Sequence, residues 1–144
     1  MSKKRFGLKR NWRVLFGLMA LMTVLLGLTG CIGKEGEKVR ELDSLIISEE
    51  ALPSQLKELI DEKKEKEFQF TFSDQKNLYI CIGYGKQETG GYSIVLNDLY
   101  LTDSEVIVDT TLLGPDQDAQ AKKTATFPFI VIRTELVEQP VVYR

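Results

Sequence analysis

Two cysteines carry the most reactive side chains in this sequence of 144 residues. A thiol that loses its proton is a strong nucleophile, which forms thioethers, attacks carbonyl groups or binds metals. Cys31 follows two small residues at the end of an uncharged segment, whereas Cys81 lies between Ile80 and Ile82. These different surroundings predict different roles for the two thiols.

The segment before Cys31 has the composition of a secretory signal peptide. Residues 1–30 contain six basic residues and no acidic ones, and residues 14–28 are fifteen positions without a charge. Residues 28–31, Leu-Thr-Gly-Cys, resemble the lipobox of bacterial lipoproteins. This resemblance implies cleavage after Gly30 and a diacylglycerol on the sulfur of Cys31. Two acyl chains anchor a protein stably, because each buried methylene contributes about 0.8 kcal/mol and one chain holds only marginally.

An uncleaved transmembrane helix is the alternative interpretation of the same segment. Residues 14–33 are twenty positions without a charge, and about twenty apolar residues are enough to span a bilayer. Both interpretations place the basic residues on the cytoplasmic side and residues 32–144 outside the cytoplasm. The expected location is therefore the cell membrane, with a lipid anchor at Cys31.

The part of the chain after residue 30 is strongly acidic. It keeps 13 of the 19 basic residues and all 21 acidic ones, a formal net charge of −8. Nucleic acids bind to basic surfaces that neutralise phosphates, so this composition argues against a nucleic-acid partner. Once Cys31 is acylated, Cys81 has no thiol to pair with, and the core must be held by packing alone.

Histidine is absent from the sequence, which removes the usual general base and the commonest zinc ligand. Cys81 is expected to be a packed thiol rather than a nucleophile. Asp116 and Asp118 are oxygen ligands of the calcium-binding type, but the glycine and the distal glutamate of a calcium loop are missing. Lys122 and Lys123 form a small basic spot that would meet an acidic partner or keep a loop soluble. We expect no catalytic residue, no cofactor and no metal site.

Apolar periodicity predicts an α+β domain over residues 42–144, after a flexible tether at residues 31–41. The apolar stripe that follows Pro53 predicts one amphipathic helix over residues 53–66. From residue 68 the period changes to two, which is typical of strands. We expect an antiparallel β meander of five to six strands with the helix packed on it. The expected strands cover residues 42–47, 68–72, 78–85, 91–101, 106–113 and 127–136.

Two adjacent glycines, Gly90 and Gly91, stand directly before one of these strands. Glycine adopts positive φ at little cost, so the pair would reverse the chain into the next strand. Glycines also leave peptide groups uncovered, so a partner chain could approach the rim of the sheet there. The sequence leaves both interpretations open.

The region around these glycines resembles the C-terminal domain of the PrcB family, which is named for a subunit of a protease complex. The similarity covers about residues 78–133. Three elements carry it: a strand that ends in a glycine, a Thr-Gly-Gly-Tyr element, and an aromatic-Pro element before the last strand. These motif residues, which would form an interaction rim, are Gly83, Thr89, Gly90, Gly91, Tyr92, Phe127 and Pro128.

The resemblance implies an exported, non-catalytic subunit that accompanies a protease at the cell surface. The sequence therefore predicts a membrane-anchored interaction module outside the cytoplasm. Its expected partners are membrane lipid, through acylated Cys31, and an exported or membrane protein such as a protease. Two alternatives remain: a small-ligand or ion-binding lipoprotein with a pocket between sheet and helix, and an unusual hydrolase.

Overall fold

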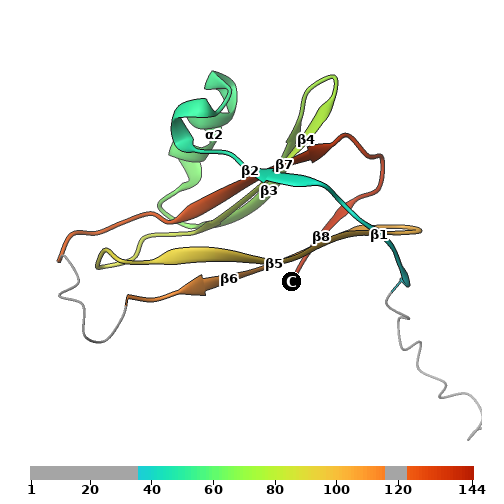
Figure 1. Ribbon diagram of the computed structural model, residues 1–144. Coiled ribbons are helices and arrows are strands. Elements are labelled where there is room, and N and C mark those ends of the chain that lie inside the picture. The colour runs from blue at the N-terminus through green and yellow to red at the C-terminus, as the bar shows by residue number, and fades with distance from the viewer. Residues whose placement is uncertain (1–35, 116–122) are drawn as a thin grey trace, which may run out of the picture. The chain divides into compact units, whose positions relative to one another are not determined.

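In the computed structural model, which describes residues 36–115 and 123–144, the strands form two sheets and a helix covers one of them (Figure 1). The upper sheet in Figure 1 has the strand order β2-β7-β4-β3, and the lower sheet has the order β1-β5-β6-β8. The elements are β1 (Lys38–Glu41), β2 (Ser44–Ile46), the 3-10 turn η1 (Glu49–Ala51), α2 (Ser54–Lys63), β3 (Glu67–Ser73), β4 (Asn77–Tyr84), β5 (Ser93–Thr102), β6 (Val106–Leu113), β7 (Phe129–Glu135) and β8 (Val141–Tyr143).

The α+β class is confirmed, but the described residues form eight strands instead of the expected five to six. The two additional strands are β1 and β8, at sheet edges, with four and three residues. All four residues of β1 are exposed, so the strand has no apolar period, and it falls within the expected tether. Its backbone nevertheless pairs with β5, because edge pairing requires backbone groups and no particular side chain.

The expectation of a single antiparallel meander is wrong. β4 and β5 follow each other in the chain but lie in different sheets, and so do β6 and β7. β8 pairs with β6 in parallel. Alternating strands have the same sequence pattern whether they pair with the next strand or cross to a second sheet, so periodicity alone does not separate these two topologies.

The predicted helix over residues 53–66 is α2, which begins one residue later, at Ser54, and ends three residues earlier, at Lys63. Its apolar side, Leu56 and Ile60, is at most 2% exposed. These side chains pack against the upper sheet in a cluster completed by Phe68, Tyr79, Cys81 and Val131. The amphipathic pattern therefore predicts which face of the helix is buried. Burial of these two aliphatic side chains contributes roughly 1.5 to 3 kcal/mol each to the stability of the fold.

A second core lies between the two sheets. Ile80 and Ile132 from the upper sheet meet Val106 and Val108 from the lower sheet, and all four are completely buried. β4 contributes alternate residues to both cores, which explains why its sequence is apolar on both faces. Cys81 is a free cysteine among the described residues, so packing holds this part of the chain together.

The hairpin between β3 and β4 is fixed by one carboxylate. Asp74 accepts hydrogen bonds from the backbone N–H groups of Lys76 and Asn77, over 2.8 and 2.7 Å, and from the Tyr79 hydroxyl. These bonds favour the charged form and lower the pKa of Asp74 to about 2. The turn therefore holds the register of β3 against β4 throughout the neutral and mildly acidic range.

Candidate functional site

Two of the four connections between the sheets, from β4 to β5 and from β6 to β7, join strand ends at one end of the domain. Residues 85–92 lead from β4 to β5, and the connection from β6 to β7 includes the described residues 114–115 and 123–128. β4 pairs with β7, and β5 pairs with β6, so the strand ends that these segments join are adjacent. We name these three stretches the crossing end. Most of the predicted motif residues lie in it.

A short antiparallel bridge joins the two connections. Gln87 N donates to Thr126 O over 2.8 Å, and Thr126 N donates to Gln87 O over 2.9 Å. The hydroxyl of Thr126 donates to the carbonyl oxygen of Thr89 over 2.8 Å. Thr89 of the motif therefore acts through its backbone, as the acceptor that ties one connection to the other.

The two glycines of the motif differ in their backbone conformation. Gly91 has φ 92°, and a Cβ added to it would lie 2.8 Å from Cβ of Pro115. Gly90 is not among the described glycines with positive φ, which are Gly85 and Gly91. Only Gly91 thus requires glycine for a conformational reason. Gly91 lies in a connection that passes from one sheet to the other, and not in the hairpin turn that the sequence suggested.

Gly83 is required by a side chain on the neighbouring strand. It pairs with Phe68, and a Cβ at Gly83 would lie 2.2 Å from the Phe68 ring. Real Cβ atoms do not approach other atoms this closely, so the ring lies where a side chain would otherwise be. This motif glycine is part of the core under α2 rather than of the exposed rim.

The aromatic and proline residues of the motif extend the contacts of the crossing end. The carbonyl oxygen of Pro128 accepts a hydrogen bond from Tyr84 N over 3.0 Å, which continues the ladder between β4 and β7. The Phe127 ring lies 5.8 Å from Nζ of Lys64, at the end of the helix. Tyr92 is half-buried beside Gly114.

Gln87, Thr126 and Pro115 were not predicted from the sequence as site residues, although Thr126 and Pro115 lie against motif residues and Gln87 pairs with Thr126. Thr126 and Thr89 are 37 positions apart. A hydrogen bond between them depends on the two-sheet topology, so no local sequence pattern could have indicated it.

The described residues contain no group of three or more Cys, Asp or Glu side chains placed to hold a metal ion. Cys81 is completely buried, and burial raises the pKa of its thiol to about 12. A thiol with this pKa is neutral at physiological pH, which agrees with a packing role. Four other predicted residues, Cys31, Asp116, Asp118 and Lys122, lie outside the described part of the chain.

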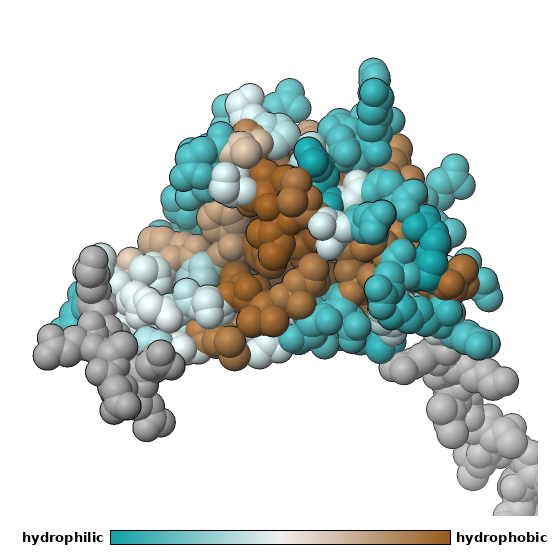
Figure 2. Space-filling view, viewed as in Figure 1, coloured by the Kyte–Doolittle hydropathy of each residue, from teal (hydrophilic) through white to brown (hydrophobic). Residues whose placement is uncertain are grey.

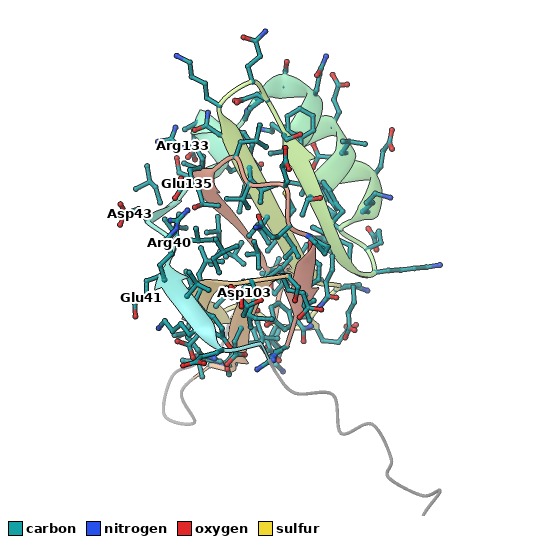
Figure 3. All side chains as sticks on the ribbon, turned by 90° about the vertical axis from the view of Figure 1, so that its right-hand side faces the viewer. Arg40, Glu41, Asp43, Asp103, Arg133 and Glu135 are labelled. Carbon is teal, nitrogen blue, oxygen red and sulfur yellow. The ribbon has the colours of Figure 1, made fainter. Side chains whose placement is uncertain are left out.

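Charged side chains gather at the opposite end of the domain, on β1, β7 and the segments beside them (Figure 3). The guanidinium of Arg40 on β1 forms an ion pair with Glu135 on β7 and so links the two sheets. Asp43 and Arg133 line a hollow of about 360 Å³ beside this pair. Because both signs of charge alternate there, the cluster largely neutralises itself and does not indicate one kind of ligand.

The space between the upper sheet and the middle of α2 is filled by the buried cluster around Leu56 and Ile60. A hollow of about 370 Å³ lies at the end of the helix, between Glu62 and Lys63 of α2 and Glu67 and Phe68 of β3. Apolar side chains also gather on the face shown in Figure 2, below the helix. Among the described residues, Leu45 and Ile46 on β2 and Val95 on β5 are 53, 56 and 41% exposed.

The described structure is a helix-covered, two-sheet domain whose motif residues make backbone hydrogen bonds and packing contacts. Residues 78–135 match the PrcB C-terminal family model. The match begins in β4 and ends with β7, so it contains both connections of the crossing end. The resemblance predicted from the sequence is confirmed. No curated protein and no solved structure matches the chain.

Proposed function

We propose that this chain is a non-enzymatic interaction module anchored to the outside of the cell membrane, and that it is an accessory subunit of an exported protein complex such as a protease complex. The observation that carries the proposal is the family match over residues 78–135. The name of the family points to a protease complex, and the motif residues in the structure hold backbone together rather than presenting acids, bases or nucleophiles.

The crossing end is the proposed contact surface for the partner. Lys86 and Glu88 are exposed on one connection, and Gly91 is exposed between them and β5. An exposed glycine leaves its peptide groups accessible to another chain. The bonds between Gln87 and Thr126 stiffen the surface, and a stiff surface loses less conformational entropy on binding.

The test of the interaction is chemical crosslinking in the native membrane, followed by mass spectrometry of the captured proteins. We expect one exported or membrane protein to be captured reproducibly, through residues of the crossing end. Recovery of a bound small molecule and no specific protein would support the ligand-binding alternative instead. A matched control is the variant Gln55→Glu, which changes an exposed residue on α2, away from the crossing end.

The membrane anchor is proposed from the Leu-Thr-Gly-Cys sequence at residues 28–31. In the described residues, no helix is both long and apolar enough to cross a bilayer. We expect Cys31→Ser to take up no labelled fatty acid and to remain uncleaved, because serine lacks the sulfur that forms the thioether. The measurement is labelling with a fatty acid, combined with the mass of the purified chain. Incorporation at the wild-type level would contradict the lipid anchor, and the variant Cys81→Ser should label normally.

A further inference from the structure

β3 is an edge strand, and its outer side has no partner among the described residues. The strand order β2-β7-β4-β3 leaves one side of β3 open along all seven of its residues. An open edge of this length offers a row of N–H and C=O groups to another strand. No bulge interrupts the register with β4, which runs from Glu67 opposite Tyr84 to Ser73 opposite Leu78.

Hydrogen bonds of the neighbouring strands show which residues of β3 point outward. Tyr84 N donates to Pro128 O, so the backbone of Tyr84 points toward β7. Directions alternate along a strand, so the backbone of Gly83 points toward its partner Phe68 on β3. Asp74 N donates to Asn77 O, which agrees with this alternation. The residues of β3 whose backbone points outward are therefore Glu67, Gln69, Thr71 and Ser73.

We propose that β3 pairs antiparallel with β3 of a second copy of this chain, with Phe70 on the twofold axis. In this register, Gln69 lies opposite Thr71 of the second copy, and Glu67 lies opposite Ser73 of the second copy. These are the four residues with outward N–H and C=O groups, so each opposed pair exchanges two backbone hydrogen bonds. The upper sheets of the two copies then form one continuous sheet.

Charges next to the strand favour this register. It places Lys66 opposite Asp74 of the second copy, so that an opposite-charge pair closes each end of the interface. A shift by two positions in one direction would instead place Lys66 opposite Lys76 of the second copy, which like charges disfavour. The same shift in the other direction would place Lys66 opposite Phe72 of the second copy, where it has no carboxylate to face. Glu67 is the only charged residue within β3, and in this register it lies opposite the uncharged Ser73 of the second copy.

The aromatic face of β3 is complementary to itself in the same register. Phe68, Phe70 and Phe72 share the face that packs under α2, and the latter two are only half-buried. Pairing places Phe70 opposite Phe70 of the second copy and Phe68 opposite Phe72 of the second copy. Aromatic pairs across antiparallel strands stabilise a sheet. The dimer would therefore extend an existing apolar cluster across the twofold axis.

The test uses charges on the other face of β3, where Gln69 and Thr71 are exposed and do not contribute to the core. The double variant Gln69→Lys/Thr71→Lys places lysines opposite lysines, and Gln69→Glu/Thr71→Glu places glutamates opposite glutamates. In sedimentation equilibrium of the full chain in density-matched detergent, we expect a wild-type dimer. Each variant alone should have a dissociation constant at least roughly tenfold higher, and an equimolar mixture of the two should regain the wild-type value.

The rescue by mixing separates lost pairing from a lost fold, because misfolded chains would not recover when combined. A control with the same change in charge is Gln55→Lys/Ser104→Lys, at two exposed positions outside β3, which should dimerise like the wild type. A wild-type monomer at all concentrations would overturn the proposal, even if β3 bound a strand of another protein. Undiminished dimerisation of the lysine variant, or a mixture that stays monomeric, would also overturn it. The proposal depends on neither the membrane anchor nor the partner of the crossing end.

Discussion

The variant Gly83→Ala is expected to lower the free energy of unfolding by about 3 kcal/mol, which corresponds to a loss of roughly 12 °C or more in Tm for a domain of this size. The added methyl group would lie 2.2 Å from the ring of Phe68. Phe68 cannot move easily, because it is 9% exposed and belongs to the cluster under α2. Either the ring leaves its position or the two paired strands separate locally.

Thermal unfolding followed by circular dichroism measures this effect, and a double-mutant cycle identifies its cause. Phe68→Ala alone removes a large buried ring and is expected to cost roughly 3 to 5 kcal/mol. In Gly83→Ala/Phe68→Ala the new methyl group has space, so the combined loss should be smaller than the sum of the single losses by about 1 kcal/mol or more. Additive losses would show that the Phe68 ring is not the reason why this position is a glycine.

The helix and the central strands could be predicted from the sequence because their patterns are local. Leu56 and Ile60 fall on one side of a helix, and burial on both faces of β4 follows from its unbroken apolar run. These patterns depend on neighbours within one or two turns or within one strand. Packing of the helix on a sheet then follows, since each element must bury its apolar side.

The arrangement of the strands in two sheets could not be predicted in the same way. It depends on where residues 85–92 take the chain, and the sequence there is equally compatible with a hairpin and with a crossing. β1 was missed because its four exposed residues, Lys-Val-Arg-Glu, gain no apolar burial and only backbone pairing holds them. Edge strands are often short and bury few apolar side chains, so their sequences carry only a weak strand pattern.

The motif was located correctly in the sequence, but the reasons for its residues required the structure. Gly83 is explained by a ring that belongs to a strand outside the matched region, and Thr89 by the hydroxyl of Thr126. A glycine in a sequence shows that a side chain is absent. Only the structure shows which neighbouring atoms take its place.

Gly90 and Gly91 are required either by the fold or by contact with a partner. We expect substitutions at the two positions to have different effects. Gly91→Val is expected to lower the free energy of unfolding by about 1 to 3 kcal/mol, because φ 92° is disfavoured for a β-branched residue. Contact of the new Cβ with Pro115, at 2.8 Å, adds to this cost. Gly91→Ala should show the same effect in weaker form.

Gly90→Ala is the informative variant, since the conformational penalty does not apply at this position. If the glycines serve the crossing between sheets, Gly90→Ala should keep its Tm within about 2 °C of the wild type and capture the partner fully. The Gly91 variants should then lose capture only in proportion to their loss of Tm. We expect this outcome, because Gly91 already has a conformational explanation and Thr89 is explained by the hydrogen bond from Thr126.

Crosslinking capture and thermal unfolding, measured on the same preparations of Gly90→Ala, Gly91→Ala and Gly91→Val, decide between the two interpretations. A partner that approaches the backbone closely would be blocked by a single methyl group at Gly90, whatever the stability of the domain. Wild-type Tm together with lost capture in Gly90→Ala would therefore contradict our expectation and place the partner's backbone against this glycine. The exposed variant Ser93→Ala, at the start of β5, controls for a small change of side chain beside the same surface and should leave both measurements unchanged.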